Sequence, residues 1–552
     1  MKGAGRRVVV VVTLLVAVAC SSSDNRGGRD GTPIVGGTLV DYQNWASGPA
    51  DGIDPALAGT LEAQQPGQLL FDGLTDYDYK TGTLEPAVAE KWSSNADATV
   101  WTFVLRPGVT FSNGDPVLPS DFKFAWERAA SRALGSPMAY HLTDNARIKG
   151  AGAVNTGTAA EMSGVKADNA ASTLTVELEA PLSFFPAVVA HIVFSPVPQK
   201  LVQALPDQTK WQQGIMIGNG PYKMSGVWKP EEGLRLTRNQ TYWGGIHNHP
   251  AYIETIDFKV SKDVDAAWAA FESGQGLTGR IPPARYAEAR SQYPGRVATQ
   301  AANGLYQWSF NMKDPVVGGP QNVKLRQAIS LAVDRDRIVR DVFNGSRLVA
   351  TGITPPGILG YRPGIARYAS LDLTRAKQLL GEWEQATGKK AADLPTIKLN
   401  FGAGAGHEPV ATIIQQNLRD LGIRSDLDPL ESRTYPAAMR RGEGQFFRVG
   451  WIADYNAYDN MLWPLFSARS TDNLTQWANP RFDGLIDAAR STIEDGRRYD
   501  NYQQAESVVL NDDTVIVPIT WFAGTIAWSA QLHSVTQSPL LFVAYDEMWL
   551  SS

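Results

Sequence analysis

The chain has 552 residues, of which 43% are hydrophobic and 19% charged, and its formal net charge is −5. Such a length exceeds what one hydrophobic core supports, so we expect two or three domains and exclude an intrinsically disordered chain. The acidic balance excludes the electrostatic footprint of a nucleic-acid-binding protein.

The first 19 residues have the pattern of a secretory signal peptide. Three basic residues within residues 2–7 precede an apolar run over residues 8–19, which is shorter than a membrane-spanning helix of ~20 residues. Cys20 is the only cysteine and follows small residues, as in a bacterial lipobox. We therefore expect residues 20–33 to comprise a lipidated Cys20 and a flexible tether. The alternative, an ordinary secretory signal with an incidental cysteine, is less favoured because no second cysteine can pair with it.

The mature chain is expected to be more acidic than the whole chain. Removing residues 1–19 takes away three of the 51 Lys and Arg residues and none of the 56 Asp and Glu residues, which leaves a net charge of −8. No later apolar run is long enough to span a bilayer. We therefore expect an extracytoplasmic protein that is lipid-anchored to the outer face of the cell membrane.

Alternating apolar residues predict strands at 101–105 and 174–178 in the first part of the chain. Between them, Ser120 is expected to cap a helix whose apolar residues up to Ala129 share one face. The region of about 60–185 is therefore predicted to be a small α+β subdomain.

The second half has the pattern of layered α/β structure. Apolar residues at helical spacing predict a helix over 325–333. A strand over 397–401, a helix over 410–421 and a strand from Ile423 form a predicted β–α–β unit. The segment 402–407 (GAGAGH) lies between the first strand and the helix. It departs from the dinucleotide-binding fingerprint and is interpreted as a Gly-rich connector.

The segment 449–456 (VGWIADYN) is predicted to be a strand that ends in a turn and carries Asp454 at its end. Trp451, Tyr455 and one carboxylate suit a guest that is extended, partly apolar and positively charged at one point, such as a peptide with a free α-amino group. The alternative is that Asp454 only caps the helical run that follows, or forms an Asx turn.

Neither metal chemistry nor catalysis is expected. His247 and His249 are the only close pair among six histidines, and no carboxylate or cysteine accompanies them, so we expect no metal and no cofactor. The sequence contains no recognisable set of nucleophile and base, and we therefore expect a protein that is not an enzyme.

Several further stretches occur in a consistent order: 85–92 (EPAVAEKW), 101–111 (WTFVLRPGVTF), 113–114 (NG), 218–222 (GNGPY), 310–312 (FNM), 323–329 (VKLRQAI), 332–335 (AVDR) and 449–456. Together they resemble the bacterial extracellular solute-binding proteins of family 5, which are the oligopeptide- and dipeptide-binding proteins of ABC importers. The resemblance covers nearly all of the mature chain.

The resemblance implies a two-lobed α/β fold of the periplasmic-binding-protein type (type II, cluster C), with an extra subdomain in the first lobe. Lobe I would comprise residues 34–280 and 505–552, and lobe II residues 281–504. The chain would cross between the lobes near 275–285 and 505–520, where a hinge would close the lobes on the guest.

The resemblance also implies roles for individual residues. Asp454 takes the place of the Asp that holds the peptide α-ammonium, and Arg448 that of an Arg near the carboxylate end. Gly450 and Ile452 would offer backbone groups to the peptide as an added strand. Four further residues are candidates for the cavity wall from their position and aromatic type alone: Tyr42, Trp45, Tyr306 and Trp308. For each of them, packing in the core is the alternative.

The implied function is a monomeric substrate-binding lipoprotein that captures short peptides and delivers them to the permease and ATPase subunits of an ABC transporter. The first alternative is the same fold binding haem, a nickel complex, glutathione or an oligosaccharide. A peptidase and a structural or adhesive surface protein are the others.

Overall fold

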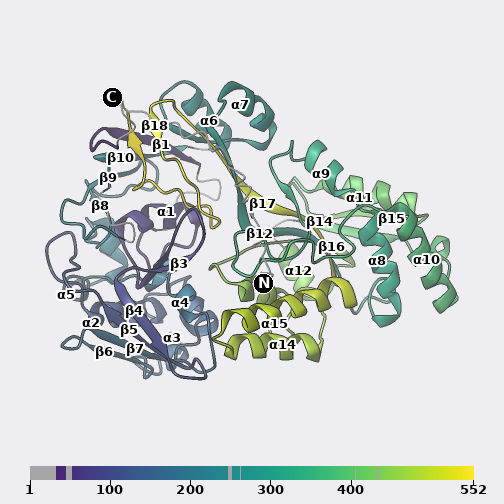
Figure 1. Ribbon diagram of the computed structural model, residues 1–552, viewed down its shortest axis with the longest axis horizontal. Helices are drawn as coiled ribbons and strands as arrows, with labels where there is room; N and C mark the ends of the chain where they lie inside the picture. The colour runs from purple at the N-terminus through teal and green to yellow at the C-terminus, as the bar shows by residue number, and fades with distance from the viewer. Residues whose placement is uncertain are drawn as a thin grey trace, which may run out of the picture.

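The computed structural model describes residues 33–44, 52–245, 251–261, 263–404, 406–431 and 434–551. The predicted signal peptide, Cys20 and Trp45 lie outside the described residues. The chain forms two halves that lie side by side along the long axis of the molecule (Figure 1). Both halves contain sheets and helices, so the two-lobed α/β fold predicted from the sequence is confirmed. The boundaries proposed between the lobes stay predictions.

The first half contains the amino-terminal elements (Figure 1). They are β1 (Thr38–Asn44), α1 (Leu61–Leu70), β2 (Thr75–Tyr77), β3 (Leu84–Pro86), β4 (Ala89–Ser94), β5 (Val100–Leu105), α2 (Pro119–Ala130), α3 (Ala151–Thr156), β6 (Val165–Asp168), β7 (Thr173–Glu177), α4 (Phe185–Val188), α5 (Gln199–Gln203), β8 (Tyr222–Met224), β9 (Gly233–Arg238), β10 (Thr255–Ser261), α6 (Val264–Glu272), β11 (Thr278–Arg280) and α7 (Tyr286–Gln292).

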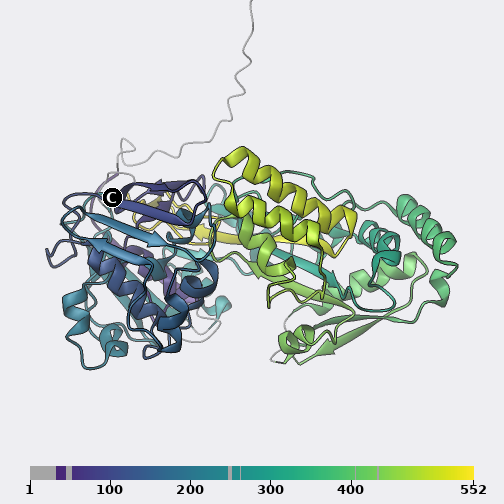
Figure 2. The same ribbon diagram turned by 90° about the horizontal axis from the view of Figure 1, so that it is seen from below.

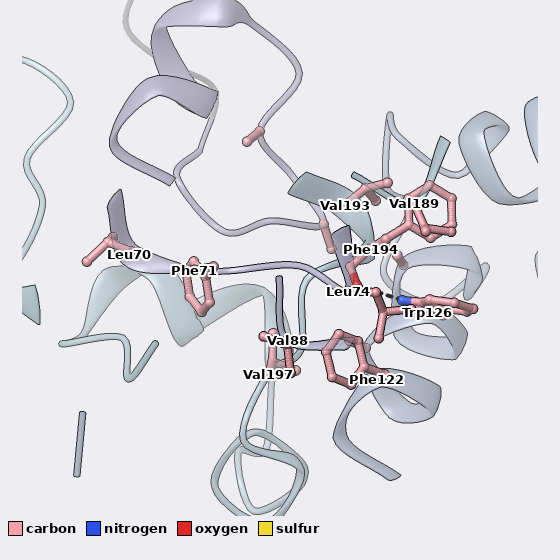
Figure 3. Packing of buried hydrophobic residues seen from close by; sticks show 14 of the residues in the cluster. Leu70, Phe71, Leu74, Val88, Phe122, Trp126, Val189, Val193, Phe194 and Val197 are labelled. Carbon is pink, nitrogen blue, oxygen red and sulfur yellow. Dashed lines mark hydrogen bonds between the residues drawn. The ribbon is translucent and has the colours of Figure 1, made fainter. Parts of the chain in front are cut away.

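A four-stranded antiparallel sheet, in the order β4-β5-β7-β6, lies within the range of the predicted subdomain, whose bounds stay a prediction. Helix α2 packs against this region through Phe122 and the fully buried Trp126, whose indole Nε1 donates to the Phe194 carbonyl at 2.8 Å (Figure 3). The expectation that Ser120 caps this helix is wrong. The helix begins at Pro119, and Asp121 Oδ2 accepts from the backbone N–H of Leu118 instead.

The second half contains the remaining elements (Figure 1). They are β12 (Val297–Phe310), α8 (Val323–Ala332), α9 (Arg335–Asp341), β13 (Leu348–Val349), α10 (Leu373–Thr387), β14 (Ile397–Gly402), α11 (Glu408–Asp420), β15 (Ser425–Leu430), α12 (Tyr435–Arg440), β16 (Phe446–Ile452), α13 (Tyr458–Phe466), α14 (Pro480–Ser491), α15 (Asp495–Ser507) and β17 (Ile516–Trp528); β18 (Leu532–His533) and β19 (Trp549–Leu550) return to the first half.

The predicted β–α–β unit is β14–α11–β15, and its two strands pair in parallel from Ile397 opposite Ser425. The eleven-stranded sheet to which they belong extends through both halves, in the order β15-β14-β16-β12-β17-β11-β1-β10-β9-β8, with β13 beside β17. The long strands β12 and β17 run from one half into the other. At one end β17 pairs with β11, and at the other end β12 pairs with β16.

The two halves also touch outside this sheet. The backbone N–H of Ser183 donates to the Arg490 carbonyl at 2.8 Å, so the subdomain binds the end of α14. Figure 2 shows the yellow-green helices α14 and α15 reaching the blue first half. Tyr455, which follows β16, packs in the core of the first half, where its ring stacks on Phe184 at 5.8 Å. The predicted ligand segment therefore lies where the two halves meet.

Candidate ligand-binding site

Strand β16 has one open edge at the border between the halves. On one side it pairs with β12 along its whole length, from Ile452 opposite Gly304 to Phe446 opposite Phe310. On the other side it pairs with β14 only at Phe446 and Phe447. From residue 448 to 452, no strand of the described chain pairs with this side of β16.

The backbone groups of alternate residues point toward the open edge. Two hydrogen bonds fix the phase: the Gln445 carbonyl accepts from Asn311 N–H at 2.9 Å, and Ala453 N–H donates to the Asn303 carbonyl at 2.7 Å, both toward the β12 side. Because a strand alternates with a period of two, Gly450 and Ile452 direct their N–H and C=O groups away from β12. This is the orientation that an added peptide strand needs.

Asp454 lies just beyond this strand and does not cap a helix. The residue that caps α13 is Ala457, which offers no side-chain bond, so the capping alternative is wrong. The Asp454 carboxylate accepts from Tyr140 Oη at 3.3 Å, across the border of the halves, and from Asn460 Nδ2 at 3.4 Å. Asn460 Oδ1 in turn accepts from Asp454 N–H at 3.0 Å and from Trp451 Nε1 at 3.1 Å.

Asp454 is a carboxylate without a cation. Burial raises its pKa above the usual 3.8, although the hydrogen bonds from Asn460, Tyr140 and Asn145 oppose the shift. None of the described Lys or Arg residues forms an ion pair with it. A half-buried carboxylate that is held only by neutral donors gains a partner when an ammonium group enters.

A cavity of about 280 Å³ lies against Asp454, and both halves line it. The second half contributes residues 452–456, and the first half contributes aromatic side chains that include Tyr77, Tyr140 and His191. The described lining residues include the acids Asp76 and Asp454 but neither Lys nor Arg. Burial lowers the pKa of His191 to about 4, so this histidine is neutral at pH 7. The cavity therefore favours a cationic group with apolar surroundings.

Two arginines lie near each other beyond this end of the site: Arg448 on β16 and Arg347 directly before β13. Arg448 lies 4.6 Å above the Tyr306 ring, and Arg347 lies 4.7 Å above the Phe522 ring. Neither forms an ion pair with a carboxylate of the described residues, and Arg448 Nε and Arg347 Nη1 have no hydrogen-bond partner. His407 accompanies them, and burial and both arginines lower its pKa to about 4. These groups can bind an anion such as a carboxylate.

Gly450 leaves room for the Arg448 side chain. A Cβ added at Gly450 would lie 2.5 Å from Arg448 Nη2 and 3.3 Å from the Phe522 ring. Residues 448 and 450 share one face of the strand, so the absence of a side chain at Gly450 allows the guanidinium to fold back over it.

The structure brings only some of the predicted residues to this cavity. Ile452, Asp454 and Tyr455 line it, whereas Trp451 lies behind it and bonds to Asn460. Tyr42 donates to Gln275 Oε1 at 3.3 Å and is not part of the described lining. Tyr306 and Trp308 are 2% and 0% exposed in the core of the second half, although the Tyr306 ring lies beneath Arg448.

Several site residues were missed from the sequence: Tyr140, Asn460, Arg347 and His407. Tyr140 comes from the subdomain, more than 300 positions before Asp454, and no periodicity in the sequence indicates that contact. His407 was interpreted as part of a connector, which it is, because it directly precedes α11. Tyr306 Oη and His407 Nδ1 are 3.2 Å apart, and this contact depends on the sheet order.

Two classes of site are not found in the part of the chain that the structure describes. No group of three or more His, Cys, Asp and Glu side chains there could hold a metal ion. Within the same residues, every helix is too short or too polar to cross a membrane.

The comparisons with known proteins agree with the fold. The sequence profile described as bacterial extracellular solute-binding proteins, family 5 Middle, matches residues 83–473. The oligopeptide-binding protein OppA of Bacillus subtilis is 29% identical over 479 residues, which are 84% of each chain. The periplasmic oligopeptide-binding protein OppA of Salmonella typhimurium is 31% identical over 467 residues, which are 82% of each chain.

The solved structures include a similar protein in a defined state. The periplasmic murein tripeptide-binding protein MppA, in its unliganded open form, superimposes with a TM-score of 0.82 at 25% identity. The alignment covers 94% of this chain and 98% of that one. The arrangement of the two halves is therefore similar to that of an open, unliganded binding protein.

Proposed function

Because the chain belongs to the bacterial extracellular solute-binding proteins of family 5, we propose that it captures short peptides between its two halves and delivers them to an ABC importer. The observation that carries the proposal is the cation-free Asp454 carboxylate at the end of a strand with an open edge. The names of its relatives, oligopeptide-binding and dipeptide-binding protein, support the same guest class.

The guest would lie along β16 as an added strand. Its α-ammonium would pair with Asp454, and its backbone would bond to Gly450 and Ile452, whose polar groups point to the open edge. Backbone bonds do not depend on side-chain identity, so such a site accepts many sequences. Its carboxylate would lie near Arg448 and Arg347. The six residue-to-residue steps from Arg448 to Asp454 span roughly 20 Å at about 3.3 Å each, and both side chains reach inward, so peptides of about three to five residues fit best.

Delivery would follow closure of the two halves around the guest. The closed form would bind a membrane permease driven by cytoplasmic ATPases, and a lipid on Cys20 would keep the protein at the membrane as a monomer. We propose no chemical change of the guest. The three side chains proposed to hold the two ends of the guest, Asp454, Arg448 and Arg347, would bind it through charge. Covalent catalysis would need a nucleophile activated by a neighbouring base, and the proposal assigns no residue to that role.

Isothermal titration of the wild type and Asp454→Ala with tri- to pentapeptides tests the anchoring role. Removing one partner of a buried ion pair costs about 3–5 kcal/mol, so we expect affinity to fall by roughly two to three orders of magnitude. A surface Asp would contribute ~1 kcal/mol or less. The matched control is the same peptide with an acetylated amino group, which should bind both proteins weakly. Equal affinity of the wild type for free and acetylated peptides would refute the proposal.

The identity of the guest is tested separately. Mass spectrometry of compounds that co-purify with the protein should find short peptides. Recovery of haem, a nickel complex, glutathione or an oligosaccharide in their place would assign the same cleft to another guest.

A further inference from the structure

A second and larger cavity lies between the halves, on the other side of the segment that carries Asp454. Its volume is about 490 Å³, compared with about 280 Å³ for the cavity at Asp454. Its aromatic walls come from the first half (Tyr77, Trp92, Trp101, Phe184) and from the second (Tyr458, Tyr499). We name it the aromatic cavity. Its volume lies within the roughly 300–1,000 Å³ of small-molecule sites.

The walls of the aromatic cavity present rings, while their polar ends are used elsewhere. Tyr77 Oη donates to the Ala187 carbonyl at 2.7 Å, and Trp101 Nε1 donates to the Ala98 carbonyl at 3.2 Å. Tyr458 Oη bonds to the buried Glu506. Because these donors are already satisfied, they offer no hydrogen bond to a guest, and the partly exposed rings of Tyr77, Trp92 and Tyr499 remain for contact.

The mouth of the aromatic cavity is also apolar. Leu359 and Ile493 line it and are 41% and 42% exposed, although large aliphatic side chains are usually buried. Beside them Asp495 and Arg498 form an ion pair with each other. An apolar entrance with a self-neutralised charge pair favours a neutral, apolar group over an ion.

Hydrogen bonds join the two sides of the aromatic cavity. Ser183 N–H donates to the Arg490 carbonyl at 2.8 Å, and Ser183 Oγ donates to the Ala489 carbonyl at 3.2 Å. Most of the surface of Trp101, Phe184 and Tyr458 is already covered by neighbouring residues. The rings of Tyr77, Trp92 and Tyr499 are only partly buried, and a guest in the cavity would cover their remaining surface.

We propose that the aromatic cavity binds a neutral aromatic ring. Two sources share this chemistry: a free aromatic molecule of the size of indole, and an aromatic side chain of the captured peptide. Tyr77 and Asn456 line both cavities. Asn456 follows Asp454 by two residues. Its Oδ1 accepts from Asn303 Nδ2 at 2.8 Å, and its Nδ2 donates to the Gly82 carbonyl at 2.9 Å.

Titration of the full chain with indole, followed by calorimetry, tests the site without reference to peptides. We expect saturable binding that weakens at least tenfold in Ile493→Asp and Leu359→Asp. Val227→Asp is the matched control, because Val227 is 48% exposed and lines neither cavity. Ser94→Trp, which fills the cavity from β4, should abolish indole binding. If that variant does not fold, the two mouth variants still decide the outcome.

A second arm separates the two sources and rests on the proposed peptide function. Tripeptides with Trp at position one, two or three are titrated into the wild type and Ile493→Asp. A tenfold loss for one peptide of the series assigns the ring to the guest, and a loss confined to indole assigns it to a free molecule. Unchanged binding in both arms, or indole binding that Ser94→Trp leaves intact, overturns the proposal. Absence of any peptide binding to the wild type would contradict only the peptide function.

Discussion

Asp454 combines two properties that single residues seldom have together. It is a half-buried carboxylate, and none of the described Lys or Arg residues pairs with it. Its neutral partners Tyr140 and Asn460 hold it in place from two different elements, while leaving its charge uncompensated. Such a group stabilises a bound cation at the expense of the empty protein, which is the balance that a binding site requires.

We expect Asp454→Asn to stabilise the empty protein at pH 7 and to weaken peptide binding. The folded-state pKa is raised above 3.8, so the ionised carboxyl lowers the free energy of unfolding at pH values above that pKa. This penalty diminishes as the pH falls through the folded pKa and is absent below about 3.8. Thermal melts of both proteins between pH 3.5 and 8, with the peptide absent, measure the difference. A variant that is less stable than the wild type at pH 7 would contradict the raised pKa.

Gly450→Ala is expected to disturb the anion site selectively. The new Cβ meets the mobile end of Arg448, not backbone, so stability should change by less than about 1 kcal/mol. The displaced guanidinium would lose its place over Tyr306. A hydrogen bond to a charged group contributes about 1.5–3 kcal/mol, so affinity for peptides with a free carboxylate should fall roughly tenfold or more. Amidated peptides serve as the control in the same titration, and an equal loss for them would show that Arg448 does not bind the carboxylate.

At the residue scale, the sequence indicated which residue types could bind a guest, but it did not indicate which of those residues lie at the cavity. Asp454 was predicted from its place at the end of a strand and from the family resemblance, and Arg448 from the resemblance alone; the roles of both stay predictions. Tyr306 and Trp308 were included for their position and aromatic type alone. Both are core residues, because their side chains on β12 pack against helices and strands of the second half. Nothing in the local pattern distinguishes a ring in a core from a ring in a cavity wall.

The elements were predicted well where one period dominates. Strands β5, β7 and β14 and helices α2, α8 and α11 occur where alternation or helical spacing indicated them. The open edge of β16 was not predictable in the same way. It exists because β14 diverges after Phe447, and β12, the partner on the other side, lies about 140 positions earlier in the chain. Pairing over such separations depends on the whole sheet.

The open edge makes a prediction about the guest backbone. N-methylation of a peptide amide removes one donor, and only alternate amides of an added strand face β16. Each lost bond costs about 1 kcal/mol, or roughly fivefold in affinity. A series of pentapeptides that are N-methylated at one position each should therefore show loss at every second position. A uniform loss, or none, would contradict binding as a β-strand.

At the scale of the whole molecule, the two halves are connected by a pair of long strands of the shared sheet. The two strands β12 and β17 connect them, and their pairing breaks register between Ala301 and Leu305, next to the site. The chain was predicted to cross near 275–285 and 505–520, and these positions stay a prediction; β12 follows the first range, and β17 begins within the second. The register break reduces the hydrogen bonding that resists bending, and a hinge there would move Arg448 and Asp454 together against the first half.

Closure on this hinge should be measurable in solution. The present arrangement is similar to an unliganded open form, and the Asp454 cavity has walls from both halves, so a bound peptide gains contacts when they approach. We expect the radius of gyration from small-angle X-ray scattering to decrease when saturating tetrapeptide is added to the wild type. The acetylated tetrapeptide at the same concentration is the control and should leave the radius unchanged. A ligand shifts a conformational equilibrium only by its differential affinity for the two states. If calorimetry shows peptide binding and the scattering does not change, the peptide has no higher affinity for a closed form, and a hinge driven by the guest is excluded.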